Sequence, residues 1–268
     1  MIRLHVHGAA GRLGQAIVRA ATSSGFHVTK SGRFDDLSAA VAACDVAIDV
    51  TQPQGSVAIA TCCAADGKPL VIGTTGHAND QLQKLRAAAA WTAILLAPNF
   101  SIGVNLLFWL TEKTNGVLGP NFDVEILELH HRLKKDSPSG TARRLAEIIA
   151  NARQLDYDEC VRHGREGFVG ERTQNEIGMH AVRGGDIVGE HTVFFAGPGE
   201  RIELTHRALS RDNFAQGALK AANWIIGDMA PLTGRTEDDR VALAEHGLFR
   251  HGFLPLISVS PFGGNGRE

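Results

Sequence analysis

Residues 2–14 read IRLHVHGAAGRLG, a short strand followed by a glycine-rich turn and the start of a helix. The apolar residues of the first half alternate with polar ones, which is typical of a strand. Gly8, Gly11 and Gly14 then follow in a GxxGxxG spacing. Glycine permits tight turning and close backbone approach to a pyrophosphate, and a helix N-terminus offers N–H groups to phosphates. This order of elements predicts a dinucleotide-binding turn, with a purely structural turn as the alternative.

The remainder of the first hundred residues alternates strands and helices. We expect strands at 26–29, 46–50, 70–72 and 93–96, and helices at 13–21, 54–65 and 80–90. Strands that alternate with helices indicate a parallel sheet with right-handed crossovers. The fold class predicted here is therefore α/β, a Rossmann-like parallel-sheet dinucleotide-binding domain.

A different rhythm begins after residue 101. We expect helices at 103–118, 140–151 and 214–226, a strand at 124–129, and antiparallel strands within 178–207 with a turn at Pro198-Gly199. This pattern predicts a second, smaller α+β domain with a mixed or antiparallel sheet. We place the first domain at 1–101 plus 211–268, with the last helix returning to it, and the second at 102–210, although periodicity alone does not assign that helix.

Composition and charge exclude several classes of function. The 268 residues carry 27 basic and 29 acidic side chains, a net charge of −2, so we expect no broad attraction to nucleic acid or to an anionic membrane. No apolar run approaches the ~18 residues of a membrane span, and no signal peptide precedes the first strand. The four cysteines match no zinc-site spacing, which favours a reducing compartment. These observations predict a cytoplasmic protein.

The end of the second predicted strand bears on cofactor choice. An acid at this place usually holds the ribose diol of NAD. Here the chain reads Lys30-Ser31-Gly32-Arg33. Basic and hydroxyl groups suit the 2′-phosphate of NADP, and an exposed loop with incidental charge is the alternative. We therefore expect NADPH to be used at least as well as NADH, with Arg33 near the ribose.

Residues 128–142 read ELHHRLKKDSPSGTA and carry the densest group of polar side chains. A strand delivers two histidines into a lysine-rich loop, and Ser139 is placed to cap the helix that follows. Gly140 and Thr141 lie in the first turn of this helix. Their N–H groups, together with the cationic loop, suit a substrate with carboxylates.

The adjacent His130 and His131 are expected to have different roles, because successive residues of a strand point to opposite sides. Histidine is the side chain best suited to donate a proton near neutral pH. A metal site needs a third ligand, and no HExxH pattern is present, so we predict no metal. A merely solvated surface loop is the alternative.

This segment resembles the motif E-x-H-H-x-x-K-x-D-A-P-S-G-T-A of the dihydrodipicolinate reductase family, also named 4-hydroxy-tetrahydrodipicolinate reductase. Ser137 replaces the usual alanine. The turn at 11–14 and the stretches 73–76, 97–105 and 185–191 also resemble the family, in the same order. The resemblance extends over roughly residues 2–227.

The resemblance implies an NADPH- or NADH-dependent reductase of the diaminopimelate–lysine pathway that adds hydride to C4 of a cyclic dicarboxylate. It assigns His130 as the general acid, Lys134 as a second catalytic residue, and His131, Gly140 and Thr141 to the substrate. The cofactor residues that it implies are Gly8, Ala9, Ala10, Gly11, Arg12, Leu13, Gly73, Thr74, Thr75, Ala97, Pro98, Asn99 and Phe100.

The resemblance also implies an assembly. The family is usually tetrameric through its central sheet, so we expect a homotetramer in which the strands of 178–207 face a partner subunit. The second domain would then serve both substrate binding and oligomerisation. Gly247-Leu248-Phe249 resembles the family's last element but arrives late, and the Gly/Ser-rich tail beyond it is expected to be disordered.

Two other functions fit parts of the sequence. An aspartate- or homoserine-type dehydrogenase would share the domain plan but lacks the His-His-x-x-Lys…Ser-Gly-Thr arrangement. A non-catalytic dinucleotide sensor would need the glycine turn but not a proton donor. The presence of His130 and Lys134 favours the enzyme.

Overall fold

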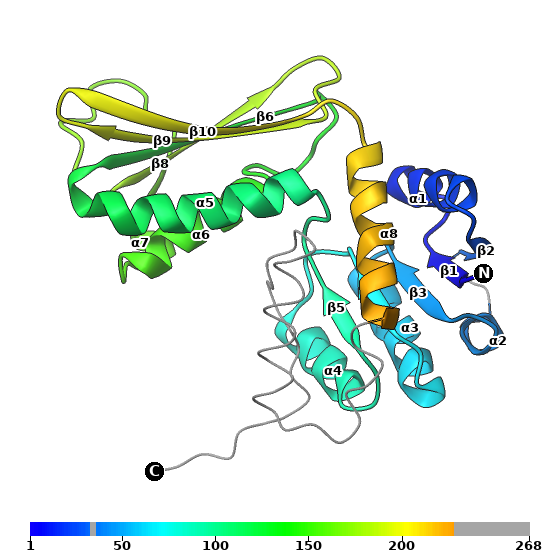
Figure 1. Cartoon of the computed structure of the whole chain (residues 1–268). Coiled ribbons are helices and arrows are strands. Elements are labelled where there is room, and N and C mark those ends of the chain that lie inside the picture. The colour runs from blue at the N-terminus through cyan, green and yellow to red at the C-terminus, as the bar shows by residue number, and fades with distance from the viewer. Residues whose placement is uncertain (33–35, 228–268) are drawn as a thin grey trace, which may run out of the picture. The chain divides into compact units, whose positions relative to one another are not determined.

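The computed structural model describes residues 1–32 and 36–227, which form two compact units. Among the described residues, the first unit comprises Met1–Ile102 and 211–227, and the second comprises Gly103–Ser210 (Figure 1). Arg33 and the segment 228–268, with its Gly247-Leu248-Phe249, lie outside the described residues.

A five-stranded parallel sheet forms the centre of the first unit, as predicted. Its strands are β1 (Arg3–His7), β2 (His27–Ser31), β3 (Val46–Asp49), β4 (Leu70–Ile72) and β5 (Ile94–Leu96). Their order is β2-β1-β3-β4-β5, and every neighbouring pair is parallel. From β1 the chain first adds β2 on one side and then continues with β3 on the other side, so the strand order reverses between β1 and β3. Ligands of such sheets bind beyond the carboxyl ends of the strands at this switch point.

Two layers of helices cover this sheet. Helices α1 (Arg12–Ser23) and α8 (Asp212–Gly227) share one hydrophobic core with one face, and α2 (Leu37–Ala42), α3 (Pro53–Asp66) and α4 (Asn79–Ala89) share another core with the other face. Strand β3 serves both cores, because side chains alternate along a strand. Val46 and Ile48 belong to the first core, and Ala47 belongs to the second.

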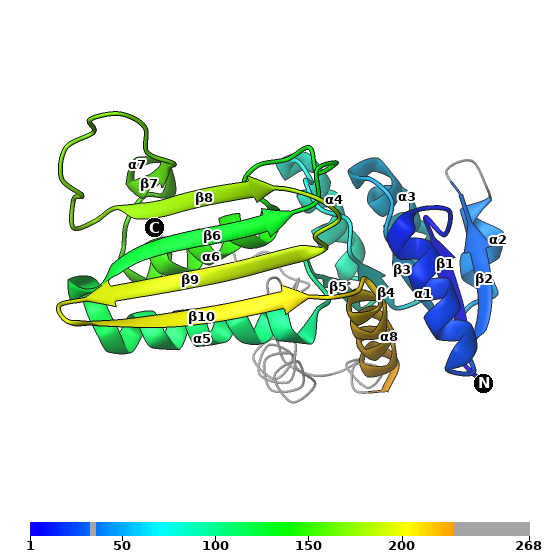
Figure 2. The same ribbon diagram turned by 90° about the horizontal axis from the view of Figure 1, so that it is seen from above.

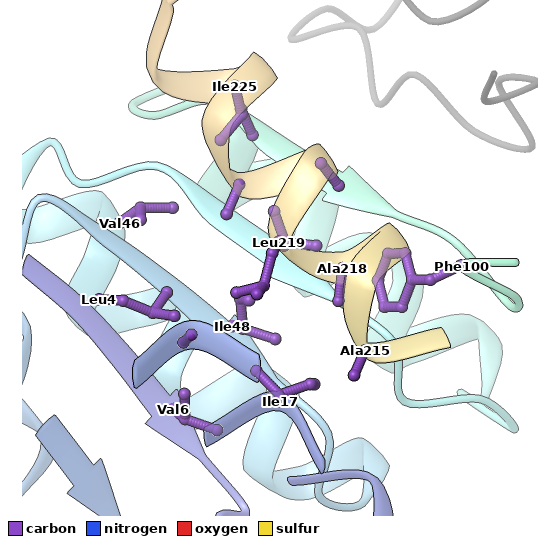
Figure 3. Packing of buried hydrophobic residues seen from close by; sticks show 14 of the residues in the cluster. Leu4, Val6, Ile17, Val46, Ile48, Phe100, Ala215, Ala218, Leu219 and Ile225 are labelled. Atoms are coloured by element: carbon purple, nitrogen blue, oxygen red, sulfur yellow. The ribbon is translucent and has the colours of Figure 1, made fainter. Parts of the chain in front are cut away.

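Helix α8 packs closely because its buried face consists largely of small residues. Ala215, Ala218 and Leu219 lie against the strand residues of the first core (Figure 3). A Cβ atom at Gly217 would lie 1.8 Å from the carbonyl oxygen of Phe100, so only glycine fits there. The last described helix thus returns to the first unit and packs beside the segment that follows β5.

A five-stranded mixed sheet forms the second unit. Its strands are β6 (Asp123–His130), β7 (Val161–His163), β8 (Ile177–Arg183), β9 (Gly189–Gly197) and β10 (Glu200–Ala208), in the order β10-β9-β6-β8-β7. The expected antiparallel hairpin is confirmed for β9 and β10, which flank Pro198-Gly199. It is wrong for β8, which pairs in parallel with β6 and β7. Strand β6, from earlier in the chain, lies between β8 and β9 and separates them.

Helices lie along one face of this sheet. Figures 1 and 2 show α5 (Ile102–Leu118) and α6 (Gly140–Ala152) on the same side, with the short helices η1 (Gly119–Asn121) and α7 (Tyr157–Cys160) completing the unit. Alternate residues of β6 are buried toward this side, among them Val124, Ile126 and His130. The opposite face carries no helix within residues 103–210.

Candidate functional site

The glycine turn between β1 and α1 fits tightly against its neighbours. Gly8 has a φ of +92°, and a Cβ atom there would lie 2.8 Å from the carbonyl oxygen of Val50, just beyond β3. A Cβ atom at Gly14 would lie 2.2 Å from the carbonyl oxygen of Gly8. Inside the turn, the N–H of Gly11 donates to that same oxygen at 3.0 Å. Glycine is therefore required at Gly8 by conformation and contact, and at Gly14 by contact alone.

The N-terminus of α1 leaves room for an anion. Gly11 is the N-cap residue and supplies no side chain to cap the first turn. Arg12 begins the helix and is exposed, whereas Leu13 packs against the core, and Ala9 and Ala10 complete the turn. The first N–H groups of a helix have no intrahelical acceptor, and the helix dipole favours negative charge there. The turn therefore fits the pyrophosphate of a dinucleotide.

The other predicted cofactor residues lie at the same edge of the sheet. Gly73, Thr74 and Thr75 follow β4, and 97–100 follows β5. A Cβ atom at Gly73 would lie 2.5 Å from the ring of Phe100, so these two segments touch. Because the strands are parallel, their carboxyl ends meet at one edge with the glycine turn. Ala97, Pro98 and Asn99 lie here as well, and Asn99 accepts a hydrogen bond from the N–H of Ser101 at 2.8 Å.

A buried carboxylate, which the sequence reading missed, connects two of these segments. Asp49, the last residue of β3, is fully buried. It accepts hydrogen bonds from the hydroxyls of Thr51 at 2.5 Å, Ser56 at 2.6 Å and Thr74 at 2.8 Å. Thr74 in turn accepts from the N–H of Thr51 at 2.9 Å. The sequence could have indicated this network, because Asp49 ends an apolar strand and the hydroxyl residues Thr51 and Ser56 follow soon after it.

Ser31 at the end of β2 is buried, which disagrees with the alternative that this stretch is merely an exposed loop. Its hydroxyl lies 2.8 Å from His5 Nε2 and 2.9 Å from His7 Nδ1, and all three residues are buried. This hydroxyl is thus held by the histidines of β1. The predicted role of Arg33 lies outside the described residues.

The second unit gathers the predicted substrate residues around the end of β6 and the start of α6. Ser139 caps α6, as predicted, and its hydroxyl accepts from the N–H of Ala142 at 3.2 Å. Gly140 and Thr141 therefore occupy the first turn of the helix, the place where helices favour negative charge. Lys134 donates to both carboxylate oxygens of Asp136 at 2.9 Å.

His130 and His131 differ in environment. His130 is the last residue of β6 and is buried, whereas His131 follows the strand and is half-buried. The carbonyl of His130 accepts from the N–H of Gly184 at 2.9 Å, and the N–H of Arg132 donates to Gly185 at 3.2 Å. The histidine loop is therefore attached to the turn that follows β8.

A network beneath His130 was not predicted. Glu128, on the same face of β6, is fully buried and lies 2.5 Å from His130 Nδ1. Its two oxygens also accept from Arg183 at 2.7 and 2.8 Å, and from the N–H of Ser139 at 3.0 Å. Burial alone would raise the pKa of Glu128, but the hydrogen bonds from His130 and Arg183 outweigh it and lower this pKa to about 2.

A second histidine packs against the first. The ring centroids of His130 and His191 lie 5.2 Å apart at an interplanar angle of 72°. His191 Nε2 is 3.0 Å from the Ser139 hydroxyl. Burial lowers the pKa of His191 to about 3, so this ring is neutral at physiological pH. Glu128 and His130 are two residues apart in a strand, and this spacing could have indicated that they share a face. Arg183 and His191 come from distant segments, so no local spacing indicated that they join this network.

Within the described chain, no group of three histidine, cysteine, aspartate or glutamate side chains is placed to hold a metal ion. Among the same residues, no helix is long and apolar enough to cross a membrane.

Known protein families match both units. The family model described as dihydrodipicolinate reductase, N-terminus, matches residues 2–100, and the one described as dihydrodipicolinate reductase, C-terminus, matches residues 103–236. A 4-hydroxy-tetrahydrodipicolinate reductase of Akkermansia muciniphila is 50% identical over 229 residues, which cover 85% of this chain and 93% of that protein. The protein of the same name from Trichlorobacter lovleyi is 45% identical, covering 87% and 96%.

Solved structures agree with these matches. The dipicolinate-bound dihydrodipicolinate reductase of Paenisporosarcina sp. TG-14 superposes with a TM-score of 0.66 at 26% identity, and the match covers 84% of this chain and 95% of that one. The scyllo-inositol dehydrogenase of Lactobacillus casei with bound NAD(H) gives a TM-score of 0.51 at 11% identity, covering 94% and 97%. The latter shows a shared fold alone.

Proposed function

The chain belongs to the dihydrodipicolinate reductase family, and on this premise we propose that it reduces 4-hydroxy-tetrahydrodipicolinate to tetrahydrodipicolinate with NADPH or NADH. This reaction is a step of diaminopimelate and lysine biosynthesis. The observation that carries the proposal is the joint arrangement of His130, Lys134 and the N-terminus of α6 within one unit.

The first unit holds the cofactor. The turn of Gly8, Ala9, Ala10, Gly11, Arg12 and Leu13 would hold its pyrophosphate, and Gly73, Thr74, Thr75, Ala97, Pro98, Asn99 and Phe100 would hold the rest. The tight contacts of Gly8 and Gly14 support this assignment, because a turn free of side chains lets the phosphates reach the backbone. When bound, the reduced nicotinamide supplies the hydride that is added at ring C4.

The second unit holds the dicarboxylate substrate. The N–H groups of Gly140 and Thr141 bind one carboxylate directionally, and Lys134 and His131 supply further donors. The dipicolinate bound to the reductase of Paenisporosarcina supports a small dicarboxylate in this family. Lys134 is drawn from Asp136 to the substrate carboxylate, which offers an equivalent pair of oxygens.

His130 is the general acid. Addition of hydride to an electron-poor ring leaves electron density that a proton must neutralise, and a cationic surrounding lowers the energy of this charge. His130 suits the task because its Nδ1 is held by Glu128, which leaves Nε2 as the nitrogen that can face a substrate.

The assembly is a homotetramer in the cytoplasm. The face of the mixed sheet that carries no described helix supports an interface there, because a sheet face with apolar residues gains stability when it is covered. The strand pairing places the apolar residues Leu127, Phe194 and Val182 on this face of the sheet.

A coupled assay tests the proposed reaction. Dihydrodipicolinate synthase generates the unstable substrate in place, and NADPH absorbance is followed. We expect substrate-dependent oxidation by the wild type and at least about tenfold lower kcat in His130→Gln, because the proton donor is lost. NADPH binding should survive in this variant, since His130 lies outside the first unit.

The matched control is His163→Gln, which alters an exposed histidine of β7 in the same unit. Its kcat should equal that of the wild type. Cofactor binding without any substrate-dependent oxidation in the wild type would favour a dinucleotide sensor instead, and an unaltered kcat in His130→Gln would remove this residue from the mechanism.

A further inference from the structure

The strongest unassigned feature is the buried carboxylate behind the proposed general acid. Glu128 and His130 are two residues apart in β6, so their side chains leave the strand on the same face. In the parallel neighbour β8, Arg183 pairs in register with His130. Its guanidinium thus reaches Glu128 diagonally, with both Nη atoms within 2.8 Å of the carboxylate. Three distant segments, β6, β8 and the start of α6, therefore meet at one carboxylate.

We propose that Glu128 and Arg183 are positioning residues that hold His130 in a single tautomer, with Nδ1–H donating to Glu128 and Nε2 left as the proton-transfer nitrogen. The proposal rests on the proposed function only for the use of that proton. The tautomer itself is a property of this chain alone. Which ring nitrogen carries the proton is set by the hydrogen bond that the other nitrogen makes.

The surroundings of Glu128 keep it an anion and therefore an acceptor. A fully buried carboxylate needs donors to remain charged. Glu128 has donors from Arg183, from His130 and from the N–H of Ser139. An ionised carboxylate can only accept hydrogen bonds, so His130 Nδ1 must carry a hydrogen whenever Glu128 is charged.

The other nitrogen of His130 faces a position without a side chain. A Cβ atom at Gly189, the first residue of β9, would lie only 2.9 Å from His130 Nε2. Only a residue without a side chain fits this close to Nε2, whereas Nδ1 contacts Glu128. The two ring nitrogens of His130 therefore have different surroundings, a carboxylate at Nδ1 and a glycine at Nε2.

Charged and titratable groups from several elements surround His130 and the residues in contact with it, Glu128 and His191. They are Glu128 on β6, Arg183 on β8, His191 on β9, His206 on β10, and Lys134 with Asp136 in the loop that precedes α6. His191 is neutral near pH 7, and burial also lowers the pKa of His206. Of the described groups, Glu128 is the anion in direct contact with the ring.

The test compares Glu128→Gln with Glu125→Gln. Glu125 is a matched control, because it lies on β6, faces the opposite side and is also held by basic residues, Arg165, Arg172 and His180. A role limited to structure would give both variants the same phenotype. The first measurement is the pH profile of kcat in the coupled assay, and the second is the ¹⁵N NMR spectrum of the imidazoles, in which His130→Gln identifies the His130 signals.

We expect Glu128→Gln to lower kcat at least about tenfold with KM within about twofold, and to alter the pH profile of kcat. The effect follows because the variant loses the carboxylate that accepts from His130 Nδ1 and orients the ring. In the spectrum, neutral His130 should carry its proton on Nδ1 in the wild type and on Nε2 in Glu128→Gln, because the glutamine amide can donate to Nδ1. Glu125→Gln should leave both readouts unchanged.

Arg183→Lys provides a second variant that keeps one positive charge but loses the paired hydrogen bonds. It should retain the Nδ1–H tautomer and lower kcat less than Glu128→Gln. The proposal is overturned if neutral His130 already carries its proton on Nε2 in the wild type, or if Glu128→Gln leaves tautomer and pH profile unaltered. Failure of the proposed function would appear differently, as absence of substrate-dependent NADPH oxidation with the Nδ1–H tautomer intact.

Discussion

The two adjacent lysines of the histidine loop, Lys134 and Lys135, lie in different environments. The side chain of Lys134 is 19% exposed and is held against Asp136, whereas Lys135 is exposed. Because the Asp136 side chain is 62% exposed, this ion pair contributes little to stability, so the position of Lys134 suits a functional role better than a structural one. The same reasoning separates His130, which is held by a buried carboxylate, from the exposed His163.

Lys134→Ala should therefore lower kcat/KM at least about tenfold, because a substrate carboxylate loses its cationic partner. Lys135→Ala should stay within about twofold of the wild type. Steady-state kinetics in the coupled assay measures both. Equal losses in the two variants would mean that only the overall charge of the loop matters.

At the level of elements, the turn between β1 and α1 shows how contact constrains sequence. The pattern contains three glycines, but the space available for a side chain differs from one to the next. A Cβ atom at Gly11 would lie 3.4 Å from the nearest carbonyl oxygen, which is ordinary contact, whereas at Gly14 it would lie 2.2 Å from the carbonyl of Gly8. Helix α1 can thus approach the turn only because Gly14 has no side chain.

Gly14→Ala should destabilise the protein by about 1–3 kcal/mol, since the helix must move away from the turn. It should also weaken NADPH binding, because the N–H groups of the first helical turn move with it. Gly11→Ala should leave the melting temperature of the cofactor-free protein near that of the wild type. Thermal unfolding and fluorescence titration with NADPH measure the two effects. A Gly14→Ala protein with wild-type melting temperature would contradict the packing argument.

At the level of the whole molecule, the two units are built on different principles. The first unit has a sheet covered on both faces by apolar cores. The second has helices along one face, and strand β6 carries Glu125 and Glu128, which are held by basic residues on opposite faces. For both Glu125 and Glu128, burial raises the pKa, but hydrogen bonds from basic side chains outweigh it and lower the pKa from its usual 4.5 to about 2.

Acid should therefore destabilise the protein between about pH 4.5 and pH 2. A carboxylate whose pKa is lowered by folding contributes its full stabilisation above the pKa of the unfolded chain, and this contribution is lost as the pH falls through the folded value. The expected loss is roughly 2–3 kcal/mol for each carboxylate. Urea unfolding followed by circular dichroism in a pH series measures it. Glu125→Gln should be less stable at pH 7 but show a shallower decline, and a flat wild-type profile would refute the assignment.

The sequence by itself determined the order of elements and the class of fold. Apolar alternation, glycine spacing and the cap at Ser139 act over a few residues, so they can be read along the chain. The short α2, α7 and β7 were missed because they contain too few residues to show a period. The local signals at Gly8, Gly11 and His130 likewise sufficed to locate both candidate sites.

Tertiary structure alone decided what surrounds those residues. The pairing of β8 with β6, the return of α8 to the first sheet and the meeting of Arg183 with Glu128 each join segments that are far apart in sequence. Such contacts depend on the order of the strands in each sheet, and the local periodicity of the sequence does not specify this order. Asp49 and Glu128 illustrate the physical reason: a buried carboxylate is stable only with donors around it, and those donors come from wherever the folded chain brings them.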